Sequence, residues 1–218
     1  MRKPFFQDRL DAGQRLGREL SGRQDLTPSQ HLVVLGLPRG GVPVAAEVAT
    51  SLRAELDVLV VRKLGVPFRP ELAMGAVSED EMTVLNEHII EHARITAAQQ
   101  EHAIRQQRQE VAERAIRFRP PGRGPIPLQG RTAVVVDDGV ATGATAQVAG
   151  QLARARGAAR VILAIPVAPY EVFQQLSDDA VFDEVVCLYS PARFRSVGGY
   201  YADFGQVSDA QVRQILGT

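Results

Sequence analysis

The stretch "VVVDDGVATGAT", from Val134 to Thr145, decides the fold and points to a ligand. Its apolar start indicates a buried strand, and its second half leads into a helix. In open α/β sheets, ligands bind beyond the carboxyl ends of strands, and the adjacent Asp137 and Asp138 stand at such an end. A turn in which Asp and Thr merely cap the helix is the alternative, but it does not need two carboxylates. The pattern therefore favours a binding site.

The two halves of this stretch suit different parts of one ligand. Ionised carboxylates only accept hydrogen bonds, so Asp137 and Asp138 suit sugar hydroxyls. Gly143 allows close approach of the backbone to a phosphate, and the N–H groups and dipole of the following helix favour the same group. Thr142 and Thr145 add hydroxyl donors. Phosphate on the loop and a diol on the carboxylates describe a ribose 5-phosphate, and neither a Walker A nor a GxGxxG loop is present.

Composition limits the class of protein. The 218 residues fit one α/β domain with an insertion, and 45% hydrophobic residues suffice for a packed core. Lys+Arg and Asp+Glu each number 25, without the basic excess of nucleic-acid binders. Cys187 is the single cysteine, which excludes an intramolecular disulfide and a cysteine metal cluster. The charged first residues lack a signal-peptide core, and no run approaches the roughly 18 apolar residues of a membrane span. We expect a cytoplasmic protein without membrane or nucleic-acid partners.

The order of apolar runs predicts an α/β fold. Strand-like runs lie at 31–37, 57–61, 132–138, 160–167 and 184–190, and helix-like segments at 8–20, 42–52, 144–157 and 169–176. Strands rich in Val and Ile indicate a parallel sheet covered by helices on both faces. The sequence predicts a flexible hairpin at 72–86. It also predicts a helical insertion at 87–119, which ends in a Pro/Gly-rich connection. We expect one domain over residues 1–218.

The stretch at 134–145 resembles the motif with which type I phosphoribosyltransferases bind 5-phosphoribosyl 1-pyrophosphate (PRPP). The resemblance implies that family's central parallel sheet, and that Asp137 and Asp138 bind the 2- and 3-hydroxyls of ribose and reach Mg²⁺ only indirectly. It further implies that the 5-phosphate is held by Ala141, Thr142, Gly143, Ala144 and Thr145. Gly139 departs from the pattern, because the family usually has a bulkier apolar residue there.

A second loop, "LGLPRGG" from Leu35 to Gly41, resembles the pyrophosphate loop of the same family. Gly40 and Gly41 at a strand end can wrap an anion with backbone N–H groups, and Arg39 adds a guanidinium suited to phosphate oxygens. The resemblance implies a cis peptide bond between Pro38 and Arg39. It also suggests pyrophosphate contacts for Arg62 and Lys63, for which a solvated strand end is the alternative.

The C-terminal segment 189–218 resembles in position the hood that selects the base. Phe194, Tyr200 or Tyr201 could stack on a flat ring, and Asp203 could contact the base. The alternative is a loop that covers the core. The hairpin at 72–86 resembles in position a loop that closes over the substrate.

The insertion carries an apolar residue every seven positions. Ile90, Ala97, Ile104, Val111 and Phe118 form this stripe, and one break in the helix is compatible with it. The stripe is too narrow and polar-flanked for a second core, so we expect it to pack along the domain edge or in a homodimer. His88 and His92 are spaced for one metal, but a solvated helix face explains them better.

The leading functional hypothesis is transfer of 5-phosphoribosyl from PRPP to a nitrogenous, purine- or pyrimidine-like base, with release of pyrophosphate. The resemblance implies a PRPP-dependent pentosyltransferase that uses Mg²⁺ and the catalytic residues Asp137, Asp138 and Arg39. A regulator that binds PRPP or a nucleotide without catalysis is the first alternative, because fold does not determine function. A phosphoribosyl-handling hydrolase or lyase is the second. The sequence does not identify the acceptor.

Overall fold

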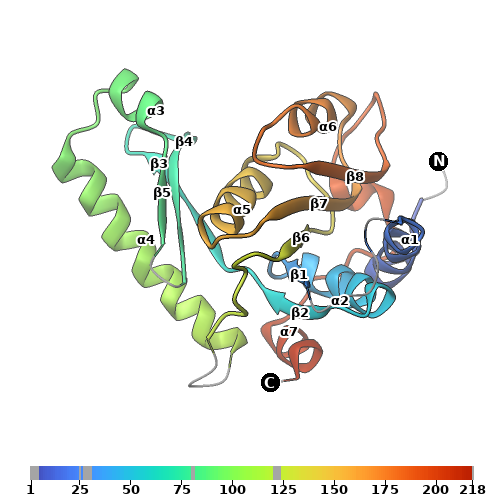
Figure 1. Cartoon of the computed structure of the whole chain (residues 1–218). Helices are drawn as coiled ribbons and strands as arrows, with labels where there is room; N and C mark the ends of the chain where they lie inside the picture. The colour runs from blue at the N-terminus through green and yellow to red at the C-terminus, as the bar shows by residue number, and fades with distance from the viewer. Residues whose placement is uncertain (1–4, 25, 27–30, 80–81, 120–123, 218) are drawn as a thin grey trace.

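The computed structural model describes residues 5–24, 26, 31–79, 82–119 and 124–217 (Figure 1). Within these residues the named strands form a sheet of five strands and a sheet of three. The smaller sheet stands between the long helix α4 and helix α5, which itself covers the larger sheet (Figure 1). The parallel sheet carries both signature loops, and the smaller sheet belongs to the insertion side of the molecule.

Five parallel strands form the central sheet, and the predicted fold class is confirmed. Their order is β2-β1-β6-β7-β8. The bounds are Leu32–Gly36 for β1, Glu55–Val58 for β2, Thr132–Val136 for β6, Arg160–Val167 for β7 and Glu184–Tyr189 for β8. Strands β1 and β6 are neighbours and end together, with Gly36 opposite Val136. The loops that follow these two strands therefore meet at one edge of the sheet.

Helices cover both faces of this sheet, as its apolar strands require. The bounds are Arg9–Ser21 for α1, Gly41–Leu52 for α2, Ala144–Ala155 for α5 and Tyr170–Ser177 for α6. Helices α1 and α2 bury Val34 and Val134 on one face. On the other face, α5 and α6 join a core with Val33 and Val135. Alternate residues of each strand thus enter opposite cores, because successive side chains of a strand point to opposite faces.

Residues 61–119 form an arm beside the central sheet. Its bounds are Val61–Val66 for β3, Arg69–Ser78 for β4, Thr83–Leu85 for β5, Glu87–His92 for α3 and Ala97–Phe118 for α4. The predicted hairpin is β4 and β5, but β3 pairs antiparallel with β4 as well. Strand β3 was not predicted from the sequence, and Arg62 and Lys63, which were expected after a strand, lie within it. The predicted helix is broken once, before a capping box at Thr96 starts α4.

The apolar stripe of the insertion is covered by its own chain. Ile90, Val111 and Phe118 are buried in a cluster with residues of β3 and β4, and Ile104 packs against that cluster. Ala97, the remaining stripe residue, is exposed. Because this burial needs no second subunit, the stripe gives no reason to expect a dimer. The homodimer stays a prediction.

The C-terminal segment contains a helix that the sequence analysis did not identify. A short 3-10 turn at Val197–Tyr200 is followed by α7 at Asp209–Leu216, which buries Val212 in the same cluster as α4. Before α7, Tyr201 pairs with Phe6 in a parallel bridge, and Asp203 N–H donates to the Gln7 carbonyl oxygen at 2.8 Å. The segment therefore runs against α1 at the edge of the domain.

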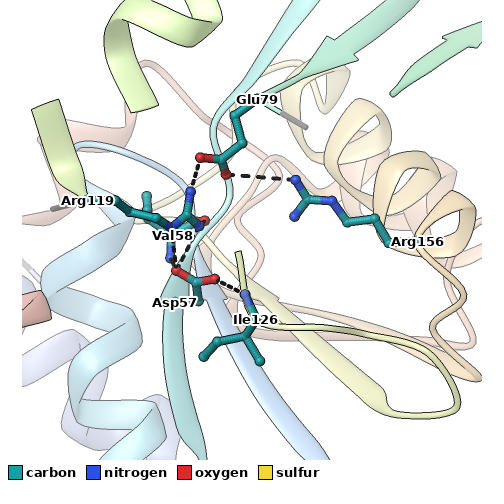
Figure 2. Close-up of polar contacts among 6 residues, drawn as sticks. All are labelled: Asp57, Val58, Glu79, Arg119, Ile126 and Arg156. Carbon is teal, nitrogen blue, oxygen red and sulfur yellow. Dashed lines mark hydrogen bonds and ion pairs between the residues drawn. The ribbon is translucent and has the colours of Figure 1, made fainter. Parts of the chain in front are cut away.

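A buried ion network fastens the arm to the central sheet (Figure 2). Arg119, directly after α4, donates to the Asp57 carboxylate of β2 at 2.7 Å and to the Val58 carbonyl at 2.6 Å. It also pairs with Glu79, which follows β4, and Glu79 lies 3.8 Å from Arg156 at the end of α5. The four charged side chains are at most 9% exposed. Glu79 thus anchors the hairpin next to its tip, whereas residues 80–81 and 120–123 lie outside the described residues.

Candidate functional site

The two signature loops contact one another at the edge of the parallel sheet. Leu37 N–H donates to the Val136 carbonyl oxygen at 2.9 Å, which continues the pairing of β1 with β6. A Cβ atom at Gly40 would overlap the Asp138 carboxylate, and one at Gly41 would lie 2.6 Å from the Val136 oxygen. Only glycine therefore fits these positions, because the acidic pair lies directly against the glycine loop.

The carboxyl group of Asp137 holds its proton more tightly than an ordinary aspartate does. Burial raises the pKa of its carboxyl well above the usual range, and the neighbouring charge of Asp138 raises the pKa further. Its Oδ1 atom accepts a hydrogen bond from the Asp138 N–H at 2.8 Å.

Asp138 is held by two residues that the sequence analysis did not assign to the site. Arg9 of α1 donates through Nε to Asp138 Oδ2 at 2.8 Å, and its guanidinium stacks 3.9 Å from the centre of the Phe204 ring. The Tyr201 hydroxyl donates to the Asp138 backbone oxygen at 2.6 Å. Burial raises the pKa of Tyr201, so this hydroxyl stays protonated as a donor. Both partners are remote in sequence from Asp138, and no local motif marks them.

The loop from Gly139 to Thr145 presents a helix N-terminus. Gly143 caps α5 with a positive φ of 83°, and the N–H groups of the first turn, from Ala144 on, have no partner within the helix. Ala141, Thr142 and Thr145 are exposed. A Cβ atom at Gly139, where φ is 149°, would lie 2.5 Å from Val197 Cγ1. This close contact with the C-terminal segment explains why no bulky residue stands at Gly139.

A cavity of about 250 Å³ adjoins both loops. Its lining includes Pro38 from the glycine loop, Arg62 and Lys63 from β3, and Thr145 from the start of α5. The peptide bond between Pro38 and Arg39 is cis, as the resemblance implied. The structure thus brings Arg62 and Lys63 together with both loops, rather than leaving them at a solvated strand end.

Arg39 forms an ion pair with a residue of α7. Its Nη1 atom lies 3.5 Å from Asp209 Oδ1, and 48% of the side chain is exposed. Arg117 of α4 lies 3.8 Å from the other oxygen of the same carboxylate. Arg39 is therefore half-exposed and has a carboxylate partner in this structure.

The candidate base-binding aromatics pack on each other. The rings of Phe194 and Tyr200 stack with centroids 5.5 Å apart, and the Tyr200 hydroxyl donates to the Arg193 carbonyl oxygen at 3.0 Å. Both rings border a cluster that buries Phe6. Asp203 is exposed, and its carboxylate accepts from Gly205 N–H at 3.0 Å. This packing agrees with the alternative of a covering loop, and base binding by these residues stays a prediction.

The acidic pair suits a metal that shares its ligands with a substrate. Among the residues that the structure describes, no group of three or more His, Cys, Asp or Glu side chains could hold a metal ion. Mg²⁺ keeps several waters when it binds with substrate phosphates, so Asp137 and Asp138 could reach such an ion through water or ribose hydroxyls. None of the described helices is long and apolar enough to span a bilayer.

A glycine loop and an acidic loop that leads into a helix N-terminus, at the ends of adjacent parallel strands, are typical of α/β domains that bind phosphorylated ligands. Residues 7–187 match the family model for the phosphoribosyl transferase domain, and the chain belongs to that family.

Relatives of known sequence or structure agree with this membership. The chain is 53% identical over 212 residues to the Mycobacterium tuberculosis (strain H37Rv) protein named "Putative phosphoribosyl transferase Rv0571c", and equally to MT0597 of strain CDC 1551. These matches cover 97% of the chain and 46% of each relative, so the chain spans about half their length. The crystal structure of TT1426 from Thermus thermophilus is 43% identical, with a TM-score of 0.84 and 97% of both chains covered. AQ2163 from Aquifex aeolicus, at 13% identity and a TM-score of 0.50 over 87% of this chain and 78% of that one, shares the fold alone.

Proposed function

We propose that this protein transfers the 5-phosphoribosyl group of PRPP to a nitrogenous acceptor and releases pyrophosphate. One observation carries the proposal: the carboxylates of Asp137 and Asp138 lie directly against Gly40 and Gly41, so a diol site adjoins an anion loop. PRPP has the matching order of groups, because its ribose diol lies between the 5-phosphate and the pyrophosphate.

Each signature loop takes one part of this substrate. Asp137 and Asp138 accept hydrogen bonds from the ribose 2- and 3-hydroxyls. Ala141, Thr142, Gly143, Ala144 and Thr145 hold the 5-phosphate at the N-terminus of α5, where N–H groups and the helix dipole favour an anion. Arg39, Gly40, Gly41, Arg62 and Lys63 hold the pyrophosphate. The cavity that Pro38, Arg62, Lys63 and Thr145 share supports binding of both phosphate groups at one site.

The chemical step exchanges one bond at C1 of the ribose. The bond from C1 to the pyrophosphate oxygen breaks, and pyrophosphate leaves with the electron pair. A nitrogen of the acceptor then donates its pair to C1, and its proton passes to solvent. Positive charge develops on the ribose ring between these events, and the nearby carboxylate of Asp138 stabilises it. Mg²⁺, when bound with PRPP, supplies positive charge that offsets the departing pyrophosphate.

The acceptor lies on the side of the ribose away from the pyrophosphate, because the attacking nitrogen replaces the leaving group from the opposite face. The C-terminal segment approaches the site on the side of Gly139, where Val197 packs. This segment contains the candidate base contacts Phe194, Tyr200 and Asp203. The acceptor is a flat nitrogenous ring of the purine or pyrimidine type. We also propose that the protein acts in the cytoplasm.

Release of pyrophosphate from PRPP, measured with Mg²⁺ across a panel of purine and pyrimidine bases, tests the activity. The Asp138→Asn variant should lower both turnover and PRPP affinity, because a charge-assisted acceptor of a ribose hydroxyl is lost. Asp178→Asn is the matched control, since Asp178 is exposed at the end of α6. PRPP binding without turnover on any base would favour the regulator. PRPP affinity that is unchanged in Asp138→Asn would refute the assigned site.

A further inference from the structure

The cavity between the two loops receives a side chain from the arm that the assignments above do not use. Arg114 of α4 lines it together with Arg62 and Lys63 of β3 and Thr145 of α5. Of the described residues in this lining, three are cationic and none is acidic. A cavity lined by cationic side chains favours an anion.

Arg114 has no carboxylate of its own. Within the described part of the chain, no Asp or Glu lies within ion-pair distance of its guanidinium, and the nearby Glu110 pairs with Arg62 instead. Partial burial lowers the pKa of Arg114, and the positive charges of Arg62 and Arg39 lower it further. The positive charges of Arg62 and Arg39 repel that of Arg114, and an anionic ligand would offset this repulsion.

The end of α4 that carries Arg114 is fixed to the central sheet. Arg119 follows the last residue of α4, and its guanidinium is buried against Asp57, the Val58 carbonyl and Glu79 (Figure 2). Arg114 lies five residues earlier, little more than one helical turn away. The buried network therefore sets the position of Arg114 at the cavity, and the guanidinium is in place before any ligand binds.

We propose that Arg114 binds the pyrophosphate of PRPP, so that the helical insertion completes the anion site. A guanidinium can donate two parallel hydrogen bonds to phosphate oxygens. Arg114 would supply them from α4, on the side of the cavity formed by the arm. This inference rests on the proposed function, which makes pyrophosphate the leaving group. It gives α4 a role in binding in addition to its packing against the smaller sheet.

Calorimetric titration of the full chain with inorganic pyrophosphate and Mg²⁺ at about 0.15 M salt tests the inference without any turnover. In Arg114→Gln the dissociation constant for pyrophosphate should rise about ten-fold, which is the loss of one hydrogen bond between charged groups. Ribose 5-phosphate, titrated in parallel, should bind both proteins equally, because it uses the loop at 141–145. Arg105→Gln is the matched control, since Arg105 is exposed on α4 and pairs with Glu101.

Equal pyrophosphate affinity in Arg114→Gln and the parent protein would overturn the inference. So would an equal loss in Arg105→Gln, which would reflect net charge alone, or an equal loss of ribose 5-phosphate affinity, which would place Arg114 at the other phosphate. A parent protein that binds no pyrophosphate would also overturn it. If Arg114 proves necessary for pyrophosphate binding but no base is ribosylated, the proposed transfer fails and the anion site stands.

Discussion

Replacing Asp57 by alanine should destabilise the protein by about 3 kcal/mol. The Asp57 side chain is 9% exposed and that of Arg119 is 7% exposed. Asp57 accepts hydrogen bonds from Arg119 Nη2 at 2.7 Å and from the N–H groups of Val58 and Ile126 at 2.8 Å each. Removing one partner of a buried ion pair costs about 3–5 kcal/mol, because the remaining charge stays desolvated. The lower end applies here, since Glu79 and the Val58 carbonyl still accept from Arg119.

Urea unfolding, followed by circular dichroism, measures this loss as a lower midpoint at an unchanged slope. Glu55→Gln is the matched control on the same strand, because Glu55 is 58% exposed and pairs with Arg131 at the surface. It should change the free energy of unfolding by less than about 1 kcal/mol. If Asp57→Ala costs no more than Glu55→Gln, the network does not stabilise the attachment of the arm, and the reasoning is wrong.

Two further predictions concern the strand-end loop. The raised pKa of Asp137 means that the folded state binds its proton more tightly than the unfolded chain does, so ionisation costs stability as the pH rises above about 4. Thermal unfolding should therefore show Asp137→Asn to be more stable than the parent at pH 7, with a smaller gain at pH 4, and an equal gain at both pH values would contradict this. Gly139→Val should lose about 1–3 kcal/mol, because its φ of 149° and its contact with Val197 exclude a side chain. In the same assay Gly124→Ala, whose Cβ would meet nothing within 4 Å, should be nearly neutral, and an equal loss in both variants would refute the packing argument.

The parallel sheet and its loops could be predicted because their signals are local. Each strand is a short run of Val, Ile and Leu, and each is followed by a break. The spacing from Asp137 to Thr145 places carboxylates and helix N-terminus within one connection, so their proximity needs no tertiary information. The meeting of this connection with Gly40 and Gly41 follows from a single pairing, that of β1 with β6.

The parts that the sequence analysis missed depend on distant contacts. Strand β3 contains Arg62, Lys63 and Gly65, and its pairing with β4 is irregular, so neither alternation nor β-propensity marks it. Helix α7 is short and is recognisable chiefly by its capping box at Ser208. Arg9 looks like any charged residue of an amphipathic helix until its partner is known.

The two contacts that hold Asp138, from Arg9 and Tyr201, affect the order in which the protein folds. Arg9 lies 129 residues before Asp138 and Tyr201 lies 63 residues after it. Contacts of such separation form late, because the entropy of closing the intervening loops must be overcome first. During synthesis the acidic pair leaves the ribosome well before Tyr201 does. The contact between Tyr201 and Asp138 therefore forms only after residue 201 has been made. A nascent chain halted before Tyr201 would already contain both signature loops, yet its acidic pair would lack half of its support.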